Sequence, residues 1–178
     1  MKNILIISTS LRNNSNSYIL ATKFMEGAKK AGNNVELISL QNKTINFCKG
    51  CFACQKLGKC IIKDDANSIV EKMLNADVIC WATPVYYYSI SGQMKTLIDR
   101  ANSLYSSNYK FREVYLLLTA TENESFTKEG AIKACQGWVD CFDDVVLKDT
   151  LFVGDVTDPS DILGNPLLNK AYELGKKA

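Results

Sequence analysis

The chain of 178 residues contains no histidine. Histidine is the commonest general base near neutral pH and the commonest metal ligand. Its absence excludes a histidine base and a histidine-bound metal centre. Any chemistry must therefore come from Cys, Asp, Glu, Lys, Tyr or Ser side chains, or from a bound cofactor.

Long apolar runs and long charged runs are also missing. No segment approaches the ~20 apolar residues of a membrane span, and the apolar core of the N-terminal MKNILIISTS is too short for a secretory signal. The net charge is only +2, without extended runs of one sign, so neither nucleic acid nor a membrane is indicated as a partner. We expect a cytoplasmic protein, in which thiols stay reduced.

Short apolar runs alternate with segments of helical periodicity along the chain. Strands are predicted at 2–8, 35–40, 77–83, 113–119 and within 144–154. A helix is expected after each of them, and the last helix starts near Pro166. This alternation indicates one domain, residues 1–178, with a parallel sheet covered on both faces. The pattern alone leaves flavodoxin-like and Rossmann-like strand orders open.

The first predicted strand runs into a polar loop, STSLRNNSNS at 8–17, and then into a helix. Free N–H groups at a helix N-terminus bind phosphate, and hydroxyls and an arginine add further donors. The loop has neither the G-x-G-x-x-G nor the G-x4-G-K-[ST] pattern, which argues against a dinucleotide or a triphosphate. A phosphate monoester, as in FMN, is favoured over a plain Ser/Asn turn.

Two further segments follow predicted strands and should border the same crevice, because parallel strands end at one edge of the sheet. The first is TPVYYYS at 83–89, with three consecutive tyrosines. Aromatic faces and backbone amides suit an isoalloxazine ring, although at least one tyrosine is expected to pack in the core or in an interface. The second segment is TATENES at 119–125.

These segments and the cysteine-rich stretch described below together resemble the flavodoxin-fold NAD(P)H-dependent FMN reductase and iron–sulfur flavoprotein group. The resemblance covers nearly the whole chain. It implies an α/β, flavodoxin-like three-layer sandwich: a five-stranded parallel sheet in the order 2-1-3-4-5, with helices on both faces. Thr9 and Leu11 stand where the family's phosphate loop, G-S-P-R-x-x-S-N-T, has Gly and Pro.

The resemblance also implies FMN as cofactor and NAD(P)H as co-substrate. Its phosphate loop corresponds to residues 8–17, and its flavin-ring segments correspond to those after the third and fourth strands. The residues expected to bind FMN are Ser8, Ser10, Arg12, Ser15, Asn16, Ser17, Pro84, Val85, Tyr86, Tyr87, Thr119, Ala120 and Thr121.

Four of the seven cysteines lie in a predicted loop at 41–63, within FCKGCFACQKLGKC. They are Cys48, Cys51, Cys54 and Cys60. Because this loop follows the second strand, we expect it at the carboxyl edge of the sheet, beside the flavin. Four thiolates in one short segment suit a 4Fe–4S cluster, whereas zinc usually takes two separated C-x2-C pairs.

Reduced thiols and a zinc site stay open beside the cluster. Many members of the group keep a G-C-x-x-C segment without a cluster, and Phe47 stands where cluster proteins often have Pro. Free cysteine also packs as a small hydrophobe. The remaining cysteines, Cys80, Cys135 and Cys141, are interpreted as packing residues.

Together these features predict an FMN-dependent NAD(P)H:acceptor oxidoreductase, similar to FMN and quinone reductases, with a cluster feeding the flavin if one is bound. The acceptor would be a small molecule or a redox carrier protein, and the resemblance implies a homodimer or homotetramer. A non-enzymatic flavodoxin-like electron carrier and a cysteine-based redox sensor are the alternatives. Lys95, Asp99 and Arg100 are interpreted as helix surface and ion pairing, and no side chain is expected to be a catalytic acid or base.

Overall fold

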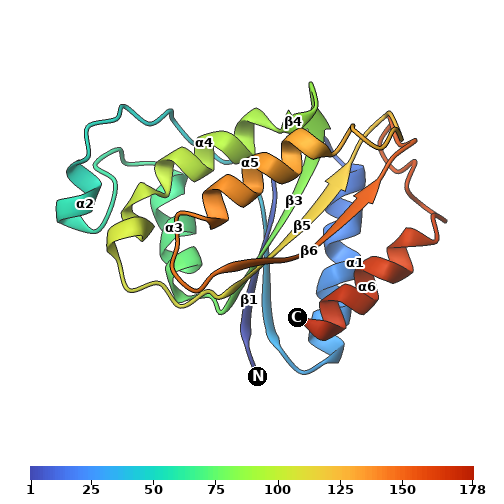
Figure 1. Ribbon diagram of the computed structural model, residues 1–178, viewed down its shortest axis with the longest axis horizontal. Helices are drawn as coiled ribbons and strands as arrows, with labels where there is room; N and C mark the ends of the chain where they lie inside the picture. Colours follow the sequence, from blue (N-terminus) through green and yellow to red (C-terminus); the bar gives the residue numbers. More distant parts are fainter.

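The computed structural model describes residues 1–178 and contains one sheet with helices on both sides (Figure 1). Its strands are β1 (Asn3–Ser8), β2 (Asn34–Ser39), β3 (Val78–Tyr86), β4 (Ser89–Ile90), β5 (Glu113–Thr119) and β6 (Val146–Val153). Its helices are α1 (Asn16–Lys30), α2 (Ala53–Leu57), α3 (Asp65–Asn75), α4 (Gly92–Arg100), the 3-10 helix η1 (Asn102–Ser106), α5 (Glu129–Val139) and α6 (Leu167–Lys177).

The strand order is β2-β1-β3-β5-β6, and all of these neighbours are parallel. The predicted flavodoxin-like order is therefore confirmed. The short β4 is an addition that pairs antiparallel with the end of β3.

The side chains of β1 show why the sheet needs cover on both faces. Ile4 and Ile6 pack on one side with α1 and α6, whereas Leu5 and Ile7 pack on the other side with α3, α4 and α5. Successive side chains of a strand point to opposite faces, so a continuous apolar run is buried only between two layers of helices. Figure 1 shows these two layers, with α1 and α6 side by side.

The tyrosine segment differs from the predicted loop. Strand β3 continues to Tyr86, which pairs with Ser89, so that Tyr87 and Tyr88 form a two-residue hairpin turn. Both have positive φ, 48° and 60°. A turn with two positive φ angles normally takes Asn or Gly, so the sequence carries none of its usual signals.

Helices α1 and α6 cross closely because each has a glycine at the contact. A Cβ atom on Gly27 would lie 1.9 Å from the carbonyl oxygen of Tyr172, and one on Gly175 would lie 2.0 Å from that of Phe24. These neighbours are backbone atoms and cannot rotate away. The crossing therefore fixes the C-terminal helix against the sheet.

We predict that Gly175→Ala destabilises the protein by about 1–3 kcal/mol, because the added methyl overpacks the crossing. Gly137→Ala is the matched control: Gly137 is exposed in α5, and a Cβ there meets nothing within 4 Å. This control should gain up to about 1 kcal/mol of helix propensity. Urea denaturation measures both effects, and equal stabilities of the two variants would contradict the close crossing.

Candidate functional site

The polar loop after β1 lies at the point where the strand order reverses, since β1 has β2 on one side and β3 on the other. Ser15 ends the loop as the N-cap of α1, and its Oγ accepts a hydrogen bond of 3.2 Å from the Tyr18 N–H. The cap satisfies one free N–H of the first turn and directs the others toward the sheet edge. This is the place where doubly wound sheets bind ligands.

A small cleft of about 100 Å³ opens at this edge. All of the predicted FMN-binding residues except Ser8 and Tyr87 line it, so the structure brings the three predicted segments together. A fourth segment, after β6, also contributes Val156, Thr157 and Pro159. The sequence analysis missed this segment, although it follows a strand that ends at the same edge.

The cleft contains a buried hydroxyl without a partner. Ser17, the second residue of α1, is 1% exposed, and its Oγ makes no hydrogen bond. A buried polar atom left unpaired costs free energy that a ligand atom can recover. A hydroxyl beside free helix N–H groups, in a space of this size, fits the phosphate group of FMN.

Two other loop residues instead brace the segment after β6. Asn16 donates to the Asp158 carbonyl at 2.9 Å and accepts from the Ile162 N–H at 3.1 Å. Arg12 donates to the Thr157 carbonyl at 2.6 Å. Asn16 thus shapes the wall of the cleft, while half of the Arg12 side chain remains exposed.

The tyrosine turn stands beside the cleft. The Tyr88 ring packs on Phe126, with centroids 5.7 Å apart, and its hydroxyl donates to Glu122 at 3.4 Å. This bond and the charge of Glu122 raise the pKa of Tyr88. Tyr86 lines the cleft, whereas Tyr87 is fully exposed and does not.

The four motif cysteines line a second hollow, of about 440 Å³. The Gly50 N–H donates to Cys48 Sγ, and the Asn102 amide donates to Cys54 Sγ, both at 3.4 Å. All seven cysteines are free, and no three side chains are arranged as a metal site. The four thiols therefore share one hollow but do not form a closed ligand set in this structure.

A fifth thiol, Cys141, which follows α5 by two residues, lines the same hollow and is exposed. The interpretation of Cys141 as a packing residue is wrong. Cys80 and Cys135 are buried as expected, and burial raises the pKa of Cys80 strongly and that of Cys135 to about 12. Sequence reasoning missed this thiol because Cys141 is far from the motif in the sequence and no local pattern connects the two.

The cysteine loop was expected at the carboxyl edge of the sheet, beside the flavin. The hollow that it forms lies elsewhere. Phe47 still lies near the start of α4, but the hollow is formed with Asp99, Arg100 and Asn102 at its other end. Helix α4 has nine residues, so its two ends are about 14 Å apart. The loop follows α4 away from the sheet edge, and Figure 1 shows α2 at the far end of the molecule from the strand tips. The two lined spaces share no residue.

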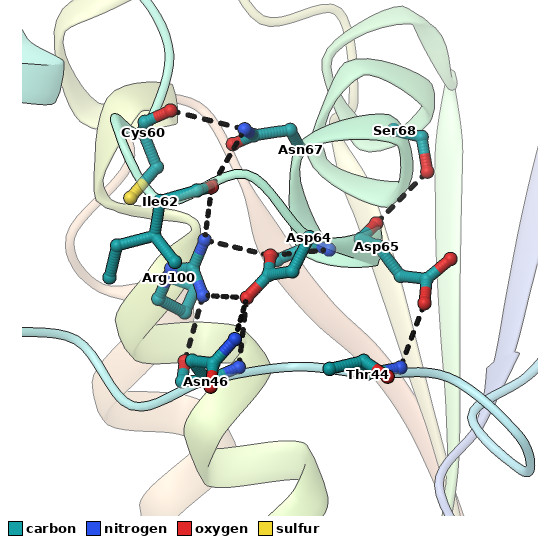
Figure 2. A network of polar contacts seen from close by, with 10 residues as sticks. Thr44, Asn46, Cys60, Ile62, Asp64, Asp65, Asn67, Ser68 and Arg100 are labelled. Carbon is teal, nitrogen blue, oxygen red and sulfur yellow. Dashed lines mark hydrogen bonds and ion pairs between the residues drawn. The ribbon is translucent and has the colours of Figure 1, made fainter.

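Arg100 and Asp64 form a buried ion pair beside this hollow (Figure 2). Their side chains are 0% and 2% exposed, so the interpretation of Arg100 as helix surface is wrong. Lys95 and Asp99 do form the expected exposed pair, at 2.6 Å. Burial alone would raise the pKa of Asp64, but hydrogen bonds from Arg100, Asn46 and Ala66 outweigh it and lower that pKa to about 2.

The fold and the polar cleft define a flavodoxin-like protein with a phosphate-sized site at the switch point of its sheet. The family model of the NADPH-dependent FMN reductases matches residues 2–143. The chain belongs to this family, as its sequence motifs predict.

Several curated relatives are named iron–sulfur flavoproteins. One from Archaeoglobus fulgidus is 41% identical over 100 residues, which are 56% of this chain and 49% of that protein. One from Methanosarcina thermophila is 30% identical over 152 residues, 85% of this chain and 80% of that protein. The chain spans about half the length of the Archaeoglobus relative and of a similar one from Methanocaldococcus jannaschii.

Solved structures share the fold. The NAD(P)H:quinone oxidoreductase of Methanothermobacter marburgensis has a TM-score of 0.75 and 18% identity, covering 99% of this chain and 95% of that one. An azoreductase from Bacillus anthracis has a TM-score of 0.74 and 17% identity, with both chains fully covered. None of the helices described above has the length and hydropathy needed to cross a bilayer.

The low pKa of Asp64 predicts a pH-dependent stability. Its value lies below the ordinary 3.8, so the ionised carboxylate stabilises the fold above that pH and the contribution is lost as the pH falls toward 2. At neutral pH it should be worth about 2 kcal/mol. By urea denaturation, the stability difference between wild type and Asp64→Asn should shrink by this amount between neutral pH and pH 2. A difference that stays constant down to pH 2 would contradict this, and Asp99→Asn is the exposed control.

Proposed function

We propose that the chain is an FMN-dependent oxidoreductase that takes a hydride from NAD(P)H and passes electrons to a quinone or a related small acceptor. Membership of the NADPH-dependent FMN reductase family supports this, and the unpaired Ser17 hydroxyl in the cleft at the switch point is the observation that carries it. When bound, FMN would supply the redox chemistry.

The chain's own residues would bind and orient the cofactor. The N–H groups at the start of α1 and the hydroxyls of Ser10, Ser15 and Ser17 would hold the phosphate, and the half-exposed Arg12 guanidinium would neutralise it. The backbone around Tyr86 and the segment at 119–121 would lie along the flavin ring. No side chain is assigned as a catalytic acid or base.

We further propose a 4Fe–4S cluster held by Cys48, Cys51, Cys54 and Cys60. The names of the relatives support it, as do four free thiols around one hollow and N–H groups directed at two of the sulfurs. Such hydrogen bonds are typical of cluster sites. When bound, the cluster would relay single electrons. A modest rearrangement of the exposed loop would have to bring the thiols together.

The physiological setting follows from the same proposal. We expect a homodimer or homotetramer, because an open flavin edge with exposed tyrosines is suited to cover by a second subunit. A redox carrier protein would be an alternative electron donor. A cytoplasmic location would keep the free thiols reduced.

The direct test is steady-state oxidation of NADH and NADPH by the flavin-loaded protein with a benzoquinone as acceptor. Turnover with either nucleotide is expected. If flavin-loaded protein shows no turnover with either, the enzyme proposal fails and a non-enzymatic electron carrier is favoured. Thiol oxidation by peroxide in protein that binds no flavin would instead favour the redox sensor.

Ser17→Ala should weaken FMN binding about tenfold or more, since it removes a hydrogen bond to a charged phosphate. The fold should lose no stability, because the hydroxyl is unpaired without ligand. Ser8→Ala is the matched control: Ser8 is also buried and unpaired but does not line the cleft. Fluorescence titration of apoprotein with FMN measures both. Equal affinities of the two variants would contradict a phosphate site at Ser17.

Serine at any one motif cysteine should lower the iron bound after anaerobic reconstitution with iron and sulfide, since a cluster takes four cysteine ligands. Cys54→Ser tests this and Cys141→Ser is the control, because Cys141 lines the same hollow outside the motif. Iron and sulfide assays give the result. Full iron content in Cys54→Ser, or loss of iron in Cys141→Ser, would overturn the assigned ligand set.

A further inference from the structure

Four of the five N–H donors of the buried Arg100 guanidinium have partners. Two form a fork with Asp64, Nη1 to Oδ2 at 2.6 Å and Nη2 to Oδ1 at 2.9 Å. The others go to backbone carbonyls, Nη1 to Asn46 at 2.8 Å and Nη2 to Ile62 at 3.1 Å. Nε is buried and has no hydrogen-bond partner.

These bonds join the two ends of the cysteine loop. Asn46 lies two residues before Cys48, and Ile62 lies two residues after Cys60. Asp64 strengthens the junction, because it accepts from the Asn46 N–H at 2.9 Å and from its side-chain amide at 3.0 Å. Figure 2 shows the two chain segments meeting at the guanidinium.

The junction is anchored to the helices that pack on the sheet. Arg100 ends α4, and Asp64 is the N-cap of α3, where it accepts from the Ala66 N–H at 3.1 Å. Asn67 of α3 adds hydrogen bonds to the carbonyls of Cys60 and Ile62. The loop ends are therefore fixed to rigid elements by polar contacts.

The loop between these ends has no core of its own. No residue from 47 to 63 is buried, and Phe47, Phe52 and Leu57 are mainly exposed. Hydrophobic burial, the usual source of order, is therefore missing here. Polar contacts therefore hold the loop: the junction at its base, and single hydrogen bonds from Asn102 to Cys54 Sγ and from Ser106 to the Gln55 carbonyl farther along.

We propose that Arg100 is a positioning residue for the cysteine loop: with Asp64 it holds the loop ends together before any metal enters. The hold on the loop ends depends on the ion pair and its hydrogen bonds alone. Its effect on iron uptake rests on the cluster proposed above. Arg100 touches no reacting atom and acts only through the loop.

The first experiment uses the iron-free full chain and trypsin, which can cut after Lys49, Lys56 and Lys59 in the loop. Arg100→Lys keeps the charge and the number of cleavage sites but loses the fork. Cleavage within the loop, followed by mass spectrometry, should be at least about tenfold faster than in wild type, because proteolysis follows the population of opened loop. Lys95→Gln, which breaks the exposed pair on the same helix, should leave the loop rate unchanged.

Asn46→Ala guards the test against misfolding of the Arg100 variant, because Asn46 is exposed and only one bond of the junction, from its side-chain amide to Asp64, depends on its side chain. It should accelerate loop cleavage by a smaller factor. Unchanged loop cleavage in both Arg100→Lys and Asn46→Ala would overturn the proposal.

The second experiment reconstitutes the same variants anaerobically with iron and sulfide and follows the rate of iron uptake. Arg100→Lys should take up iron more slowly than wild type and Lys95→Gln, because its loop ends are not held together beforehand. Equal uptake rates would overturn a role of Arg100 before metal entry. Failure of wild type to take up iron would overturn the cluster alone, and the cleavage rates would still decide the role of Arg100 in the loop.

Discussion

The parallel pairing of β1 with β2 on one side and β3 on the other is the constraint on which the remaining structure depends. It aligns Ser8 with both Ser39 and Ala82, so the loops that follow all three strands start at one edge. The helix after β1 then has its N-terminus at that edge, where free N–H groups and Ser17 meet. The phosphate-sized cleft is a direct consequence of strand order, and its wall is completed by loops from β5 and β6.

The cysteine loop is positioned by a different kind of force. The loop leaves the same edge after β2, but the ion pair of Arg100 with Asp64 and the hydrogen bonds of Arg100 hold its ends at the C-terminal end of α4. A buried pair of this kind is costly to desolvate and strongly destabilising to break on one side. The protein thus separates a phosphate-sized cleft formed at the sheet edge from a thiol-lined hollow whose loop ends are held at one ion pair, and α4 lies between the two.

The sheet and the meeting of three polar segments at one of its edges could be predicted because their signals are local or topological. Apolar runs such as ILII in β1 predict buried strands, and the family resemblance selects the strand order. The Tyr87–Tyr88 turn was not predictable, since neither residue is a usual turn former at positive φ. The burial of Arg100 and the approach of Cys141 to the hollow depend on residues far away in the sequence, and no local periodicity encodes such contacts.

We propose that one chain holds a flavin and an iron–sulfur cluster at two separate sites. The most direct measurement is the visible spectrum of anaerobically purified protein, combined with assays for flavin, iron and acid-labile sulfide. We expect flavin bands over a broad absorbance that bleaches on reduction, with FMN and about four irons per chain. Flavin bands alone, with neither iron nor sulfide, would contradict it and would leave a flavin reductase with a loop of reduced thiols.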